Sequence, residues 1–110
     1  MPLSLHDREQ AFEAKFAHDE EFRFLAAARR DKLFAQWAAI ELATPGEEGE
    51  ALVKAVLAIP DKPGHDAAVL THVGEVFAAH GKPVTEAELA VALQAAYRRA
   101  REQLGATPLD

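Results

Sequence analysis

Residues 7–39 read DREQAFEAKFAHDEEFRFLAAARRDKLFAQWAA. The stretch contains no glycine, no proline and no β-branched residue, and it is dominated by Ala, Glu, Gln, Lys, Arg and Leu, all of which favour helices. A helix of this length is about 50 Å long at ~1.5 Å per residue, which is more than a small domain needs to span its own core. The stretch therefore predicts one long helix, part of which extends from the domain.

The two halves of this helix carry different apolar stripes. The stripe of the second half has the spacing of an ordinary core face; its members are Phe22, Ala26, Leu33, Trp37 and Ile40. In the first half, Leu5, Phe12 and Phe16 form a second stripe, offset from the first by about 80° at ~100° per residue. Two interpretations stay open. Phe12 and Phe16 cap one end of the core, or the first half is an amphipathic helix that docks into a groove on another protein.

A resemblance to a known family lies in the same stretch. The run Asp7–Glu21, followed by Ala28-Arg29-Arg30, Lys32-Leu33 and Trp37-Ala38-Ala39, resembles the alphaproteobacterial ATPase inhibitor subunit zeta of the F-type ATP synthase. The likeness is close over residues 7–39 and looser from Thr44 onward. It implies a small four-helix protein whose N-terminal segment enters a catalytic interface of the ATPase head and blocks ATP hydrolysis. It also implies that ADP or ATP binds the bundle, although no phosphate-binding motif is visible.

A second helix is predicted after a strong boundary at Thr44-Pro45-Gly46-Glu47. Proline ends the first helix and suits the first position of the next, and Thr44 and Glu47 have capping-box spacing. We expect this helix to run to about Ile59, before the loop Pro60–Gly64, which two prolines stiffen. Its core positions are Leu52, Ala55, Val56 and Ile59.

Two more helices complete the chain. The third is expected to begin near Asp66 as its N-cap and to end at Gly81, and the fourth to begin at a capping box of Thr85 and Glu88 and to end at Gly105. Their apolar faces are formed by Val69, Leu70, Val73, Val76 and Phe77, and by Leu89, Leu93, Ala96, Ala100 and Leu104. Alanine-rich faces imply close helix approach and a thin core. We expect Trp37 and Phe77 to supply much of the volume of that core.

The predicted fold is therefore all-α: a four-helix antiparallel bundle with a long first helix whose N-terminal part is mobile or extends from the bundle. We expect a single domain over residues 1–110. Within it, residues 1–18 are the inhibitory segment and residues 19–105 the helical bundle.

Composition argues against several function classes. A net charge of −6 over 110 residues disfavours nucleic acid and anionic membranes as partners, and the absence of cysteine removes disulfides and thiol chemistry. No nucleophile, base or metal constellation is visible, so we expect no enzyme and no required cofactor. Without a signal-like or membrane-spanning stretch, we expect no direct membrane insertion, a monomer when free, and a cytoplasmic protein peripheral to the inner membrane when bound to ATP synthase.

The candidate partner-binding residues follow from the docking interpretation. The partner is the catalytic head of the F-type ATP synthase, and the residues are Leu5, Arg8, Phe12, Lys15, Phe16, Asp19 and Glu20. The alternative function is a helical-bundle module that binds ADP or ATP as a regulatory ligand. Its only local feature is the group Arg98, Arg99 and Arg101, which also suits a helix C-terminus electrostatically.

Two further polar groups have a plain structural interpretation. His65, His72 and Glu75 could share one side of a helix, but a metal site needs more convergent ligands, so we expect solvated or packed histidines. Arg29, Arg30 and Lys32 are expected to form a solvated face.

Overall fold

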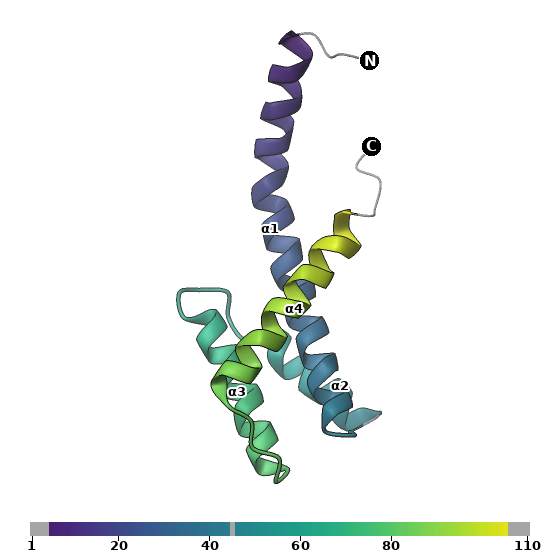
Figure 1. The fold of residues 1–110 in the computed structure, drawn as a ribbon, viewed down its shortest axis with the longest axis vertical. Helices are drawn as coiled ribbons and strands as arrows, with labels where there is room; N and C mark the ends of the chain where they lie inside the picture. Colours follow the sequence, from purple (N-terminus) through teal and green to yellow (C-terminus); the bar gives the residue numbers. More distant parts are fainter. Residues whose placement is uncertain (1–4, 45, 106–110) are drawn as a thin grey trace.

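The computed structural model describes the backbone of residues 5–44 and 46–105 and the side chains of residues 20–44 and 46–105. Four helices follow one another, namely α1 (Leu5–Glu41), α2 (Glu47–Leu57), α3 (His65–Ala79) and α4 (Glu86–Gly105). These described residues contain no strand. The predicted all-α class and the order of the four helices are confirmed (Figure 1).

The helix α1 is the axis of the molecule. It is 37 residues long, and its second half contacts α2, α3 and α4, most extensively α4 and α2. Its first half stands clear of the other helices, which gives the molecule an elongated shape with extents of 59 × 27 × 22 Å (Figure 1). The prediction that part of the first helix extends from the bundle is therefore confirmed.

One hydrophobic core lies between the second half of α1 and the other three helices. Its largest fully buried side chain is Phe34. The Trp37 ring stacks on Phe34 with centroids 5.7 Å apart, and it packs at a tilt of 37° on Phe77 of α3 with centroids 5.8 Å apart. The other buried members are Ala35, Ala38, Leu42, Leu52, Val56, Val69, Val73, Leu89, Leu93 and Ala96. Trp37 is partly buried and packs against this cluster, and Phe77 is 3% exposed, so both contribute to the core as predicted; Phe34, which the sequence interpretation left out, is the fully buried aromatic residue.

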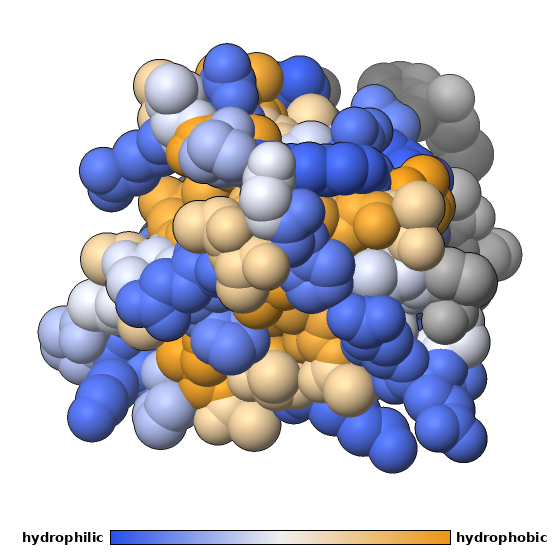
Figure 2. Space-filling view, turned by 90° about the horizontal axis from the view of Figure 1, so that it is seen from below, coloured by the Kyte–Doolittle hydropathy of each residue, from blue (hydrophilic) through white to orange (hydrophobic). Residues whose placement is uncertain are grey.

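The predicted core stripe of α1 is correct in part. Ala26 is fully buried, whereas Ile40 is 77% exposed. The sequence interpretation also left out Phe34, Ala38 and other buried residues. The physical reason is that three helices cover the second half of α1 from different sides, so its buried face is broad. Ile40 lies on the side that they leave open, and hydrophobic surface is visible at this lower end of the bundle (Figure 2).

The end of α1 explains why the predicted capping box at Thr44 and Glu47 is wrong. Ala43 adopts a positive φ of 53°, and the N–H groups of Ala43 and Thr44 donate to the carbonyls of Ile40 and Ala39. This is the Schellman arrangement, here with alanine at the left-handed position. The Thr44 hydroxyl also donates to the Ala39 carbonyl at 3.2 Å, so it ends α1, and α2 begins without a side-chain cap.

The other predicted helix starts differ in outcome. Gly64, in the left-handed region with a φ of 90°, precedes α3, so the prediction of Asp66 as its N-cap is wrong, and Asp66 lies in the first turn instead. The Thr85–Glu88 capping box is confirmed: the Glu88 N–H donates to Thr85 Oγ1 at 3.1 Å and the Thr85 N–H donates to Glu88 Oε2 at 3.4 Å.

Among the residues described, no helix is both long and apolar enough to cross a membrane.

Candidate functional site

The predicted partner-binding residues lie on the free-standing part of α1 and at its lower end. The backbone is helical from Leu5 onward, so Leu5, Phe12 and Phe16 share one side of the helix, within about 40° at ~100° per residue. Glu20 is exposed, and Phe22 is the first partly buried residue of the part described. The side chains of six predicted residues lie outside that part: Leu5, Arg8, Phe12, Lys15, Phe16 and Asp19.

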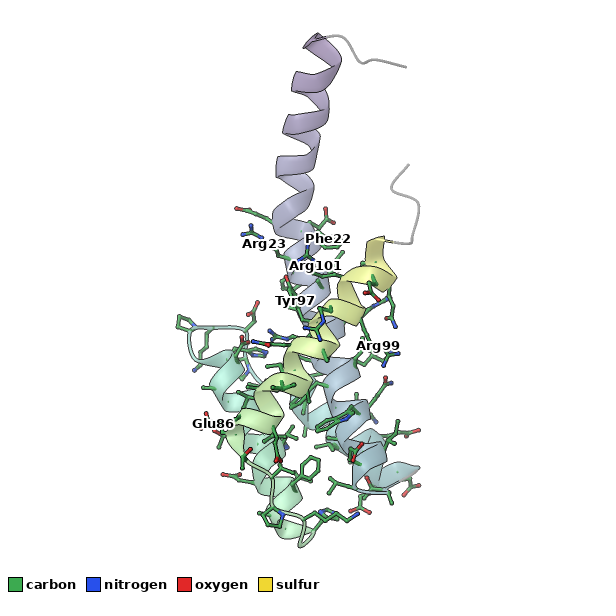
Figure 3. The ribbon with its side chains drawn as sticks, in the orientation of Figure 1. Phe22, Arg23, Glu86, Tyr97, Arg99 and Arg101 are labelled. Atoms are coloured by element: carbon green, nitrogen blue, oxygen red, sulfur yellow. The ribbon has the colours of Figure 1, made fainter. Side chains whose placement is uncertain are left out.

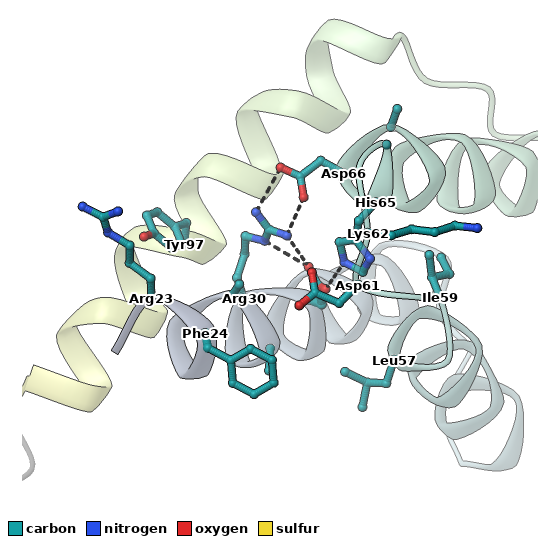
Figure 4. Close-up of a pocket in the computed structure, with 15 residues that line it drawn as sticks. Arg23, Phe24, Arg30, Leu57, Ile59, Asp61, Lys62, His65, Asp66 and Tyr97 are labelled. Atoms are coloured by element: carbon teal, nitrogen blue, oxygen red, sulfur yellow. Dashed lines mark hydrogen bonds and ion pairs between the residues drawn. The ribbon is translucent and has the colours of Figure 1, made fainter. Parts of the chain in front are cut away.

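A chain of ion pairs joins the middle of α1 to the start of α3 (Figure 4). Asp31 is 4% exposed; its Oδ1 accepts a hydrogen bond from Nε of Arg30 at 3.0 Å and forms an ion pair with a terminal guanidinium nitrogen of Arg30 at 2.9 Å. The same guanidinium reaches Asp66 at 2.8 Å. On the other side, Asp31 Oδ2 lies 2.7 Å from Nε2 of His65. The carboxylate of Asp31 is thus held between the guanidinium of Arg30 and the imidazole of His65.

The charges of this cluster stabilise one another. Burial alone lowers the pKa of Arg30, but its hydrogen bond to Asp66 and the charge of Asp31 outweigh burial, and the pKa is raised above its ordinary value. Burial also lowers the pKa of His65, yet the hydrogen bonds to Asp31 and to the Pro60 carbonyl raise it above 6.5. The charged form of each side chain is therefore favoured by its partners.

The ion cluster forms one wall of a groove of about 620 Å³ between α1, the connection from α2 to α3, and α4. Phe24 is 62% exposed there, and Tyr97 of α4 also lines the groove (Figure 4). Arg23 and Lys62 also line the groove and are exposed; among the described residues neither forms an ion pair. The groove can therefore offer aromatic faces together with two uncommitted cations.

A second groove, of about 880 Å³, runs between the end of α1 and α2. Its apolar lining includes Ala39, Ile40, Ala43 and Val53, and Lys54 lies at its side. Lys32 and Glu50 also line it, so the groove is an apolar surface with a charged edge.

Comparison with protein families gives a match over nearly the whole chain. The model of the family described as ATPase inhibitor subunit zeta matches residues 3–103. The chain belongs to this family. Comparison with curated proteins and with solved structures gave no match. The family name describes an inhibitory subunit of an ATPase, which is a regulatory role, and the match spans both the free-standing half of α1 and the bundle.

In this zeta-family chain the arginines of α4 do not converge. Arg98, Arg99 and Arg101 are all exposed. At ~100° per residue, Arg98 and Arg101 lie within about 60° of each other, whereas Arg99 points to another side. The Arg101 guanidinium lies 5.8 Å from the centroid of the Tyr97 ring, and Figure 3 shows Arg99 directed away from that ring. The three arginines therefore do not form the single basic cluster that the sequence suggested.

Of the three basic residues expected to form a solvated face, Arg29 and Lys32 are exposed and Arg30 is not. Arg30 is not on a solvated face, because its side chain is 11% exposed and tied into the ion cluster. His65 is packed against Asp31 as an ion-pair partner. Over the described part of the chain, no group of three or more His, Cys, Asp or Glu could hold a metal ion. The sequence interpretation did not include Asp31. Asp31 lies three positions before Phe34 and therefore on the same helical face, and an acidic residue on an apolar face is a signal of a buried ion pair.

Proposed function

We propose that the chain is a regulatory inhibitor of the F-type ATP synthase that blocks ATP hydrolysis by inserting the first half of α1 into a catalytic interface of the ATPase head. Family membership supports the inhibitory role. The observation that carries the proposed mechanism is the free-standing half of α1, which rises beyond the bundle along the long axis of the molecule (Figure 1). A helix without intramolecular neighbours has its whole circumference available to a partner.

The construction of α1 favours such insertion energetically. An isolated helix of this length is marginal in water because its first turn is costly to nucleate. In this chain the second half of α1 is packed in the bundle, so the first half can propagate from an existing helix and avoids that cost. Less free energy is then needed to order the segment on binding. The bundle, with transverse extents of 27 and 22 Å, is too wide to follow the helix into a cleft and acts as a stop.

The direct test is the rate of ATP hydrolysis by the cognate ATPase head at increasing concentrations of the full chain. We expect hydrolysis to fall with concentration, and a chain lacking residues 1–18 to have no effect. Circular dichroism of the shortened chain is the control, since it must remain helical for the comparison to hold. Equal inhibition by both chains would locate the inhibitory element on the bundle and overturn the mechanism.

A second candidate function is the binding of ADP or ATP to the bundle. It is supported by the groove beside the ion cluster, where Phe24 and Tyr97 offer ring faces and Arg23 and Lys62 offer cations. A base can stack on aromatic rings, and phosphates pair with arginine and lysine. Titration with ADP, followed by amide chemical shifts, tests it. We expect shifts around Lys62 and Tyr97 that Arg23→Ala with Lys62→Ala weakens. No shifts at millimolar ADP would leave docking as the function.

A further inference from the structure

A histidine is held in the same way at each end of α3. At the start of the helix, the Nδ1 atom of His65 lies 2.9 Å from the carbonyl oxygen of Pro60 and its Nε2 atom lies 2.7 Å from Asp31 Oδ2. His80, the residue after α3, has Nδ1 at 2.8 Å from the Val76 carbonyl oxygen and Nε2 at 2.9 Å from Glu48 Oε1. The two carboxylates belong to α1 and α2, so each histidine ties α3 to another helix.

This geometry requires a charged ring. Carbonyl and carboxylate oxygens accept hydrogen bonds, and a neutral imidazole has a single N–H to donate, whereas imidazolium has two. With both carboxylates ionised, all four contacts are hydrogen bonds at once only when both histidines are protonated. A proton on Asp31 instead is disfavoured, because Nε of Arg30 donates to the other oxygen of that carboxylate at 3.0 Å and the guanidinium forms an ion pair with it at 2.9 Å.

We propose that α3 is docked onto α1 and α2 by two histidinium clamps, His65–Asp31 and His80–Glu48, and that α3 loosens from those helices when the two histidines lose their protons. The contacts of α3 favour such a role, because it touches α1 and α2 less extensively than α4 and α2 touch α1. The two clamps are also the only ion pairs between α3 or its C-cap residue and the rest of the described chain apart from Asp66–Arg30.

The charges around His65 keep the net balance in favour of the protonated ring. The charged groups that face it or line its groove come from α1, from the connection and from α3 itself. They are Arg23, Arg30 and Asp31, Asp61 and Lys62, and Asp66. Burial lowers the pKa of His65, but the hydrogen bonds and the charges of Asp31 and Asp66 raise it above 6.5.

Fewer charged groups surround His80 than His65, namely Glu48 and Lys82. Its hydrogen bonds to the Val76 carbonyl and to Glu48 raise its pKa above 6.5, and the charge of Lys82 opposes them only partly. Lys82 itself donates to the backbone carbonyl of Glu41 at the end of α1. Because the folded pKa of both histidines is raised, the clamps are complete below 6.5 and are lost as the pH rises through the raised values. The docked form of α3 is therefore the form that is favoured at lower pH.

The fluorescence of Trp37 can report on whether α3 is docked. Its single tryptophan, Trp37 of α1, packs on Phe77 of α3 with centroids 5.8 Å apart. Loosening of α3 changes the surroundings of the indole, and with them its fluorescence. The groove changes as well, because His65 forms part of its lining.

The first measurement is a titration of the histidine ring signals by NMR in the full chain, from mildly acidic to mildly alkaline pH. We expect His65 and His80 to titrate above 6.5. Asp31→Asn should lower the pKa of His65 and leave that of His80 unchanged, and Glu48→Gln should do the reverse. A pKa of 6.5 or lower for either histidine in the wild type would overturn its clamp, as would a carboxylate variant that leaves its own partner histidine unmoved.

The second measurement follows Trp37 emission over the same range. We expect a pH-dependent change in the wild type and in His72→Gln, a control on the same helix, and no change in the double variant His65→Gln with His80→Gln. An unaltered pH profile in the double variant would overturn the proposal. If that variant does not fold, the NMR titration of the wild type and of the two carboxylate variants decides the question.

Discussion

Gly49 of α2 lies so close to the end of α1 that a Cβ atom added to it would stand 2.5 Å from the backbone carbonyl oxygen of Thr44. The same atom would stand 3.3 Å from the Cβ of Ala39. Glycine at this position is therefore what lets α2 turn back closely against α1. A backbone oxygen cannot move aside as a flexible side chain can.

Gly49→Ala should consequently destabilise the fold, in spite of the better helix propensity of alanine. We expect a loss of about 1–3 kcal/mol in the free energy of unfolding, the usual cost of overpacking. Urea denaturation of the two proteins measures it. Gly105→Ala is the matched control, because no atom lies within 4 Å of its added Cβ. Equal losses in the two variants would show that the close approach at Gly49 has no energetic consequence.

Phe34 should contribute more to stability than Trp37, although tryptophan is the larger residue. Phe34 is fully buried, so Phe34→Ala should cost about 3–5 kcal/mol, the typical range for a buried aromatic. Trp37 is partly exposed and stacks on the side of Phe34, so its removal leaves a smaller cavity and a smaller loss. Chemical denaturation of both variants gives the order. A greater loss for Trp37→Ala would show that the partly exposed indole contributes more to stability than the fully buried ring of Phe34.

Local signals in the sequence were sufficient for the helices and for part of their faces. Helix-forming residues without a break predicted α1, and the capping box of Thr85 and Glu88 predicted the start of α4, because both depend on interactions within a few residues. Val69, Val73 and Phe77 are buried as their spacing indicated. The free-standing half of α1 followed from length alone, since the helix is longer than the core it serves.

Features that depend on distant residues could not be obtained in this way. Which side of α1 is buried depends on the three helices that cover it, and so Ile40 was placed in the core although it is 77% exposed. The pair of Asp31 and His65 joins residues 34 positions apart. The sequence around either residue does not predict that the other is its partner. Thr44 has the spacing of a capping box with Glu47. However, Ala43 adopts a positive φ, and the Thr44 N–H donates to the Ala39 carbonyl, so Thr44 closes the end of α1.

Asp31→Asn should be strongly destabilising for a residue with no part in the hydrophobic core. It leaves His65 and one side of Arg30 without a compensating charge in a largely buried setting. We expect a loss of about 3 kcal/mol, at the low end of the range for a broken buried pair, because Arg30 keeps its contact with Asp66. Asp61→Asn is the control: it is exposed on the same groove and should change stability by less than about 0.5 kcal/mol. Similar unfolding midpoints for the two variants would contradict this reading of the ion cluster.

Removal of residues 1–18 should leave a folded bundle. The fully buried apolar residues of the described chain begin at Ala26, and the other three helices pack on the second half of α1 (Figure 1). Thermal unfolding followed by circular dichroism should give a melting temperature close to that of the full chain. A shortened chain that is unfolded at room temperature would place Phe12 and Phe16 in the core and remove the basis of the docking proposal.

Inhibition of ATP hydrolysis should depend on Phe12 and Phe16. On one side of a helix they offer a partner groove apolar area to bury, at about 25 cal/mol per Å² before ordering costs. Exposed charges nearby contribute little by comparison. The double variant Phe12→Ala with Phe16→Ala should therefore weaken inhibition by at least about tenfold in apparent affinity, which corresponds to ~1.4 kcal/mol.

Dose–response curves of both proteins against the cognate ATPase, with melting temperatures on the same samples, test this expectation. Val91→Ala serves as the control, since Val91 is an apolar residue of α4 that is 64% exposed and lies on the bundle; it should inhibit like the wild type. Undiminished inhibition by the Phe12 and Phe16 variant would show that these two rings are not what the ATPase binds. A collapsed melting temperature would instead show that both rings belong to the core, because loss of buried aromatics, and not loss of exposed ones, lowers the stability of the fold.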